Sequence, residues 1–230
     1  MPAEVCVVEE TAGAYESVVA PFAAAQAGRC GWIDAVCALE SERERNLFAP
    51  DDAADARRAF IVNVDTKWST HAPLSADAAV RSAWKGAAWT RDLYLLAISR
   101  CGAFTSLRDL RGTAGAELVE SMRDELRKCA LEVYGVPASK LRIFFHYHPQ
   151  FYRLHAHCCR AEHVCPGSEC ERAHLLTSVA HNLRQDADFY KTATLTYKLK
   201  EGEYLHTLLR DAGLLEMDTA PAQPETANAA

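Results

Sequence analysis

The 230-residue chain has no long run of apolar residues. A helix that crosses a bilayer needs about 20 predominantly apolar residues in succession, so we expect no membrane-spanning segment and no membrane partner. The N-terminus also lacks the basic-then-apolar order of a secretory signal peptide. Both features argue against a membrane-spanning or secreted protein.

An excess of basic residues is missing as well. The sequence has 25 lysines and arginines against 31 acidic residues, which gives a formal net charge of −6 at pH 7. Proteins that bind long nucleic acid present a basic face to the phosphate backbone. The charge balance therefore argues against long nucleic acid as a partner, but it leaves room for a short anionic nucleotide in a local basic pocket.

The chain has nine cysteines but lacks any Cys-x-x-Cys pair, which is a usual element of structural zinc sites. Possible metal ligands do crowd together near its C-terminal third: His155, His157, Cys158, Cys159, His163, Cys165, Cys170 and His174. Alternation along a strand would point Cys158 away from His155 and His157. We therefore predict no metal ligands and no cofactor. We interpret the cysteines as reduced thiols, which favours a cytoplasmic or nuclear location.

Nearly half of the sequence is hydrophobic (49%), enough for a core of one sizeable domain. Apolar and β-branched runs predict strands over residues 5–8, 59–64, 93–98, 141–145, 151–159 and 193–199. Helical periodicity predicts helices over residues 15–25, 32–48, 113–133 and 204–214, with a long loop over 69–90 that holds at most a helical turn. A capping box at 168–171 predicts one more helix. Strands joined by hairpins, with separate flanking helices, are typical of an α+β fold.

The stretch Phe151–Cys159 carries the most chemistry. In a strand, Arg153, His155 and His157 would share one face. Histidine can attack a phosphorus centre or transfer a proton near neutral pH, and arginine binds phosphate oxygens. A half-exposed strand with these polar residues in water is the alternative. A buried guanidinium needs a partner, so Arg153 must reach a phosphate, a carboxylate or solvent.

Two further stretches contain residues suited to anion binding. Asp65 and Lys67 follow a predicted strand, and Arg172 falls in the first turn of the helix that the capping box predicts. Free N–H groups at a helix N-terminus favour an anion. A solvated strand end and an exposed surface arginine are the alternative interpretations.

Several short motifs occur together in one order. They are Glu10-Thr11, residues 32–48, Asp65-Thr66-Lys67-Trp68, residues 92–95, residues 106–110, Leu141-Arg142, His146-Tyr147, residues 154–157, residues 166–168 and residues 171–176. With part of residues 194–197, they make the chain similar to the scavenger mRNA decapping enzymes of the histidine-triad superfamily. The resemblance covers residues 9–215.

The resemblance implies a histidine-triad fold, an antiparallel sheet with flanking helices, that pairs into a homodimer. Residues 1–30 would be a remnant of the lid or hinge region, residues 31–215 the catalytic domain, and residues 216–230 a disordered tail. The implied reaction is metal-independent hydrolysis of residual 7-methylguanosine cap, as a cap dinucleotide or short capped RNA. It would release 7-methylguanosine monophosphate through a nucleotidyl-histidine intermediate.

The resemblance also implies roles for individual residues. His155 would be the nucleophile, and His157 would bind or protonate the bridging oxygen. His146, Lys67 and Arg172 would hold phosphate oxygens. A further set would contact the nucleoside: Trp32 would stack on the methylated base, Glu42 would accept from the guanine edge, and Asp65 would contact the ribose.

Three positions near the implied phosphates depart from the family pattern. Arg153 replaces the first triad histidine, and Gln150 and Phe151 replace a serine and a tyrosine. We still assign all three to the cap and phosphate site. From the resemblance we also expect this sequence to begin about where the family's N-terminal lid domain meets the catalytic domain. Two alternative functions follow: a catalytically weak cap-binding protein, or a broader histidine-triad nucleotide hydrolase or transferase.

Overall fold

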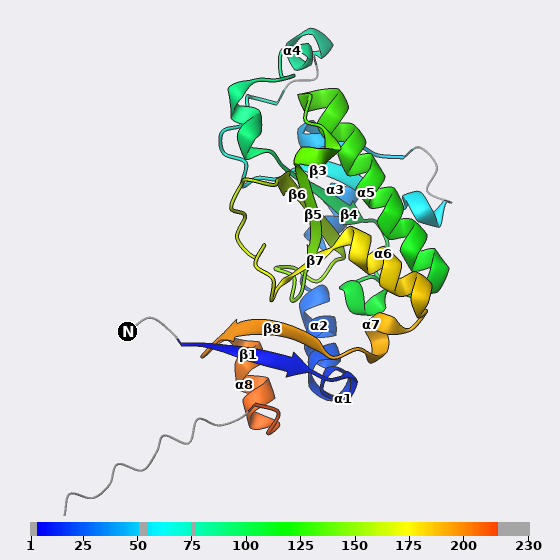
Figure 1. Cartoon of the computed structure of the whole chain (residues 1–230), viewed down its shortest axis with the longest axis vertical. Helices are drawn as coiled ribbons and strands as arrows, with labels where there is room; N and C mark the ends of the chain where they lie inside the picture. The colour runs from blue at the N-terminus through cyan, green and yellow to red at the C-terminus, as the bar shows by residue number, and fades with distance from the viewer. Residues whose placement is uncertain (1–3, 51–54, 75–76, 216–230) are drawn as a thin grey trace, which may run out of the picture.

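The computed structural model describes residues 4–50, 55–74 and 77–215 (Figure 1). Within them, six strands form an antiparallel sheet in the order β2-β3-β4-β6-β5-β7. The strands are β2 (Asn46–Phe48), β3 (Phe60–Val64), β4 (Tyr94–Ser99), β5 (Leu141–His146), β6 (His155–Arg160) and β7 (Ala173–Leu175). The predicted α+β class, with an antiparallel sheet and flanking helices, is confirmed.

The histidine-bearing strand β6 lies inside the sheet, between β4 and β5. Its neighbours place Leu96 and Phe144 opposite His157. Every residue of β6 from His155 to Cys159 is buried, so the alternative of a half-exposed strand facing water is wrong. β5 and β6 are antiparallel neighbours, as predicted, but β6 begins at His155 instead of residue 151.

The helices α5 (Gly112–Tyr134) and α6 (Leu176–Gln185) lie side by side next to this sheet (Figure 1). Along α5, buried residues such as Leu118, Met122 and Leu126 recur at the helical period and pack into the core. The helix ends at Gly135, whose φ of 71° is the left-handed conformation that commonly closes a helix.

A second, two-stranded sheet pairs β1 (Val5–Glu10) with β8 (Leu195–Lys200). It lies below the six-stranded sheet in Figure 1, together with the N-terminal helices and α8. The N-terminal segment is therefore tied to the last strand of the chain. Its origin as a lid or hinge remnant stays a prediction, and residues 216–230 lie outside the described ranges.

The remaining helical segments are short. They are α1 (Ala12–Ala14), the π-helix η1 (Tyr15–Val19), α2 (Ala20–Ala27), α3 (Trp32–Cys37), η2 (Arg43–Arg45), η3 (Ala56–Arg58), α4 (Ala78–Ser82), η4 (Ala88–Asp92), η5 (Leu107–Asp109), η6 (Ala138–Lys140), α7 (Phe189–Thr192) and α8 (Tyr204–Asp211). None of the helices in the described ranges is long and apolar enough to cross a membrane.

Two predicted helices need correction. The helix expected over residues 32–48 ends at Cys37, because Glu42 is left-handed (φ 52°) and the chain then pairs with β3 as the edge strand β2. The capping box does not start a helix either: residues 173–175 pair with β5 as β7, and α6 begins at Leu176. In both places strand pairing overrides the local helical signal.

Candidate functional site

His155 is held in a defined orientation at the start of β6. Its Nδ1 lies 2.7 Å from the main-chain carbonyl oxygen of Arg153. A carbonyl only accepts, so Nδ1 carries the proton and Nε2 keeps its lone pair. Nε2 has no hydrogen-bond partner in the described structure, and burial lowers the pKa of the ring to about 4. The result is a neutral imidazole with a free, oriented nitrogen, which can act as a nucleophile.

Two more histidines adjoin this one in a row: His157 lies against His155, and His146 lies against His157. The ring centroids of His155 and His157 are 4.8 Å apart, and those of His146 and His157 are 3.9 Å apart. Burial lowers the pKa of His146 to about 3 and that of His157 well below its usual value. Their Nε2 atoms are also unpartnered within the described residues. Three buried, unsatisfied nitrogens in adjoining rings indicate a site built for a polar ligand.

His157 is positioned by two residues that the sequence had not indicated as functional. The hydroxyl of Tyr94 lies 2.9 Å from Nδ1 of His157, and the ring of Phe144 stacks on the imidazole at 5.6 Å. Both come from strands that flank β6. In a sequence, a tyrosine on a buried strand is only a weak indication of a functional residue, because such a tyrosine is usually part of the core.

Lys67 brings positive charge to the histidines. Its charge contributes to the lowered pKa values of His146, His155 and His157. The ammonium donates to Oε1 of Gln150 at 2.9 Å, and the main-chain N–H donates to Oδ1 of Asp65 at 2.7 Å. Asp65 is buried, and burial raises its pKa. The structure thus brings Asp65, Lys67 and Gln150 together, and their roles toward a substrate stay predictions.

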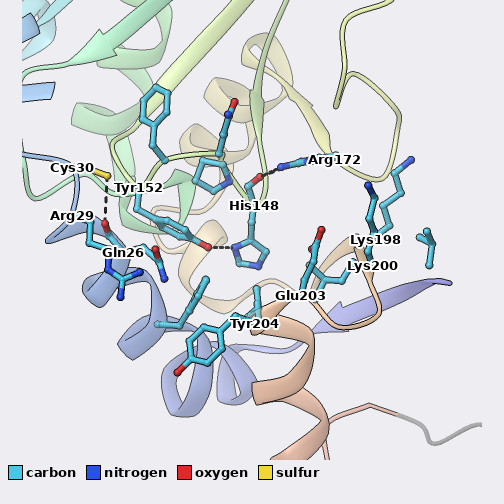
Figure 2. Close-up of a pocket in the computed structure, with 17 residues that line it drawn as sticks. Gln26, Arg29, Cys30, His148, Tyr152, Arg172, Lys198, Lys200, Glu203 and Tyr204 are labelled. Carbon is cyan, nitrogen blue, oxygen red and sulfur yellow. Dashed lines mark hydrogen bonds between the residues drawn. The ribbon is translucent and has the colours of Figure 1, made fainter. Parts of the chain in front are cut away.

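Arg172 lies elsewhere than predicted. It precedes β7 in a turn and is not in the first turn of a helix, so the argument from helix N–H groups does not apply. Its Nε and Nη2 donate to the carbonyl oxygen of His148 at 3.1 and 2.8 Å (Figure 2). Its charge nevertheless acts on His146 and His157, whose pKa values it helps to lower after burial, the main cause.

An aromatic wall connects α3 to the histidines. Phe151 stacks on His155 with ring centroids 3.9 Å apart, and Trp32 contacts Phe151 edge-on at 5.5 Å. Trp32 is 53% exposed, which is high for so large an apolar side chain. Glu42 is half-buried, with Arg45 3.9 Å away. An exposed indole beside a stacked ring can receive a flat ligand.

Arg153 reaches a carboxylate, one of the three outcomes expected for it. Its Nη2 lies 2.6 Å from Oδ1 of Asp34 on α3, and Nη1 donates to the carbonyl oxygen of Ser99. The bond that orients His155 comes from the main chain of Arg153, so it does not require an imidazole at this position.

The sequence matches a known family over this region. Residues 82–172, which hold β4, β5 and all three site histidines, match the family described as "Scavenger mRNA decapping enzyme C-term binding". The chain carries a scavenger-decapping C-terminal domain. It is similar over 89% of its length to proteins named m7GpppX diphosphatase: 32% identical over 205 residues to that of Sus scrofa, and 33% identical over 208 residues to that of Bos taurus.

The chain spans about half the length of these relatives, since the matched region is 55% of each. The protein of the same name from Homo sapiens is 29% identical over 205 residues. The resemblance to the scavenger decapping enzymes, expected from the ordered motifs, is confirmed by these matches. The roles of the individual site residues stay predictions. Within the described residues, no group of three or more histidine, cysteine, aspartate or glutamate side chains is placed to bind a metal ion.

This scavenger-decapping domain has two further features that sequence reasoning missed. A Cβ added to Gly167 would lie 2.7 Å from Nε2 of His146, so glycine lets the loop approach the ring. Glu10 is buried beneath the site. Its carboxylate accepts from Arg108 (2.6 Å), Tyr147 (2.6 Å) and Tyr197 (2.9 Å), and it lies 3.2 Å from Nε2 of His148. Glu10 and residues 106–110 were among the matching motifs, but nothing in the sequence assigned them a role.

Proposed function

We propose that the protein hydrolyses residual 7-methylguanosine cap, as a cap dinucleotide or short capped RNA, to 7-methylguanosine monophosphate. The observation that carries this proposal is His155: its Nδ1 proton is donated to a carbonyl, its Nε2 is free, and its ring stacks on Phe151, which in turn contacts Trp32. The names of the similar proteins point to the same substrate.

In the proposed reaction, Nε2 of His155 attacks the phosphorus nearest to 7-methylguanosine. The bond from that phosphorus to the bridging oxygen breaks, and a nucleoside diphosphate or RNA 5′-diphosphate leaves. With the Tyr94 hydroxyl donating to Nδ1 of His157, Nε2 of His157 carries the proton and donates to the bridging oxygen. Water then cleaves the phosphorus–nitrogen bond of the nucleotidyl-histidine and releases the monophosphate.

The other site residues bind the substrate in this proposal. Lys67, His146 and Arg172 contact phosphate oxygens, with Gln150 beside Lys67. Arg153 supports His155 through its carbonyl, which refines the expectation that its guanidinium contacts phosphate.

The cap nucleoside lies on the aromatic wall in this proposal. Trp32 stacks on the methylated, positively charged base, which adds a cation–π attraction, and Phe151 backs it. Glu42 accepts from the guanine edge, and Asp65 contacts the ribose. We also propose a homodimer and a cytoplasmic or nuclear location. The chemistry assigns every step to side chains and water, so no metal or cofactor takes part.

Product analysis tests the function. The purified protein is incubated with methylated cap dinucleotide in the presence of EDTA, and the products are separated and identified. We expect 7-methylguanosine monophosphate and a nucleoside diphosphate from the parent, and no turnover but retained cap binding from His155→Asn. Activity that EDTA abolishes and zinc restores would contradict the metal-independent mechanism. Equal rates for parent and variant would contradict the assignment of His155.

The same assay separates the alternative functions. Tight cap binding without products would identify a catalytically weak cap-binding protein. Cleavage of unmethylated dinucleotides at equal rates would identify a broader histidine-triad hydrolase. The exposed Trp32 beside Phe151 favours the methyl-cap substrate over that broader class.

A further inference from the structure

A cleft of about 410 Å³ opens beside the histidine cluster, between the two-stranded sheet and the connection from β5 to β6 (Figure 2). We call it the β8 cleft. Its lining comes mainly from α2, β8, the start of α8 and the residues that follow His148, with Arg29 and Arg172 in addition. None of the residues that line it on α2, β8 and α8 takes part in the proposed cap chemistry.

Positive charge dominates the β8 cleft. Arg29, Arg172, Lys198 and Lys200 line it against a single carboxylate, that of Glu203. Strand alternation puts Lys198 and Lys200 on one face of β8, and Figure 2 shows them extending toward the side on which Arg172 lies. In an acidic protein, this gathering of cations marks a local site for an anion.

Of these four cations, Lys200 and Arg29 are available to a ligand, whereas Lys198 and Arg172 already have partners. Lys198 has a long ion pair with Glu169 (3.8 Å), and Arg172 donates to a carbonyl. Lys200 and Arg29 are exposed, and neither forms an ion pair or side-chain hydrogen bond with any residue of the described ranges. They lie on opposite sides of the cleft (Figure 2), so a phosphate group beside either one would meet uncompensated charge.

An aromatic face lies next to the charge. Tyr204, the first residue of α8, is 66% exposed and has only a tilted contact with Phe22 at 5.9 Å. Phe22 in turn packs edge-on against Tyr152 at 5.6 Å, which fixes the floor of the cleft. An exposed, supported ring beside cations is the combination that binds single nucleotides by stacking and phosphate contact.

Two residues, Phe151 and Gln150, link the β8 cleft to the nucleophile. Phe151 lines the cleft and stacks on His155, while Gln150 lines it and accepts from Lys67. The remaining part of a substrate with its methylated base on Trp32 and its reacting phosphorus at His155 would therefore lie next to the charged lining of this cleft.

We infer that the β8 cleft binds the leaving portion of the substrate, the nucleotide 5′-diphosphate on the far side of the broken bond. Lys198 and Lys200 contact its phosphates, Arg29 contacts the next phosphate of a short RNA, and Tyr204 stacks on its base. This inference rests on the proposed function for the identity of the ligand, but the binding that it predicts does not require cleavage.

Binding measurements test the inference. Calorimetry measures the affinity of the full chain for adenosine 5′-diphosphate, for a 5′-diphosphorylated trinucleotide and for 7-methylguanosine monophosphate. Lys200→Glu and Tyr204→Ala are each expected to weaken binding of the first two by about tenfold, and to leave that of the monophosphate within about twofold. Lys191→Glu, the same charge change at an exposed residue of α7 outside the cleft, should change none of them.

Salt dependence and labelling provide independent readouts. The slope of log affinity against log salt for the trinucleotide should fall by about 1 in Lys200→Glu. Irradiation with 8-azidoadenosine 5′-diphosphate should label the peptide that contains Tyr204. Equal affinities in Lys200→Glu and Lys191→Glu, or labelling of the Trp32 peptide alone, would overturn the inference. Diphosphate binding that depends on Lys200 in a protein that cleaves no cap would support the cleft and refute the proposed function.

Discussion

At the scale of single residues, the side chain and the main chain of Arg153 form different contacts. The first triad position is Arg153, yet the group that orients His155 is the carbonyl oxygen at that position. Every amino acid supplies that carbonyl. The guanidinium is left to form the contact with Asp34, a residue whose side chain is 67% exposed.

Arg153→His is therefore expected to leave kcat for cap cleavage within about threefold, because the carbonyl that orients His155 is retained. The loss of the partly exposed contact with Asp34 should lower the free energy of unfolding by about 1 kcal/mol or less. Asp34→Asn breaks the same pair from the other side and should have the same effect. A fall in kcat of more than about tenfold for Arg153→His alone would show that the guanidinium acts on the substrate.

The buried histidines predict a pH dependence of stability. Burial lowers the pKa of His155 to about 4 and that of His146 to about 3, from 6.5. Below pH 6.5 the unfolded chain thus binds more protons than the folded one. The contribution of the two neutral histidines to the free energy of unfolding is complete above pH 6.5. It is lost as the pH falls from 6.5 toward 4, at up to about 1.4 kcal/mol per pH unit for each histidine.

Urea unfolding at pH 7, 6 and 5 measures this loss. His155→Asn should show a shallower decline than the parent, because one of the buried titrating groups is gone. Equal free energies of unfolding for the parent at pH 7 and pH 5 would mean that these histidines are not buried as neutral rings.

At the scale of elements, short segments and turns place the ligand-facing groups. Trp32 is the first residue of the short helix α3, and there it lies beside Phe151. The loop before β7 approaches His146 at Gly167, whose φ of 79° and close contact both require glycine.

Trp32→Ala should weaken binding of methylated cap by about 1–3 kcal/mol and that of unmethylated cap by less, since the cation–π attraction requires the methylated base. Fluorescence or calorimetric titration with both caps measures the difference. The exposure of Trp32 makes a large loss of stability unexpected, and unchanged thermal unfolding is the control. Equal losses for both caps would leave Trp32 without a part in methyl recognition.

Gly167→Ala should lower kcat by about tenfold or more, because the added Cβ would displace the ring of His146 from the site. Gly202→Ala is the matched control: its φ is 83°, but a Cβ there meets no atom within 4 Å in the described structure. Both variants should lose about 1 kcal/mol of stability from backbone strain. Equal activities would show that the contact with His146 is unimportant.

At the scale of the whole molecule, Glu10 joins the two sheets. It comes from β1 and contacts Arg108 of η5, Tyr197 of β8 and Tyr147 just after β5. Burial by itself raises its pKa, but the hydrogen bonds from His148 and Tyr147 and the charge of Arg108 hold that pKa below its usual value. His148 then presents the carbonyl that Arg172 contacts, so the cluster extends to the site.

Glu10→Gln should destabilise the fold by about 3–5 kcal/mol, because the fully buried Arg108 charge would lose its counter-ion. Chemical unfolding measures the loss, and Glu9→Gln, an exposed neighbour on the same strand, is the matched control with a change within about 0.5 kcal/mol. A similar small change in both variants would show that the Glu10–Arg108 pair does not hold the molecule together.

The sequence by itself determined most of the strands, the long helix α5 and the resemblance to the scavenger decapping enzymes. Strand β3, buried at all five positions, and α5, with a regular apolar period, bury enough local surface to be evident from residue types alone. The ordered motifs likewise indicated one shared site for His155, His157, His146, Lys67 and Arg172. Short motifs can be recognised from residue types and spacing alone, without knowing where the residues lie in the fold.

Only the tertiary structure decided how those residues are used. Strand pairing at β2 and β7 overrode the helical signals of residues 38–48 and 168–175, since long-range hydrogen bonds are invisible to local periodicity. The free Nε2 of His155, the Arg153 contact with Asp34, the Glu10 cluster and the β8 cleft each join groups from distant parts of the chain. Their geometry, burial and charge exist only once the chain has folded.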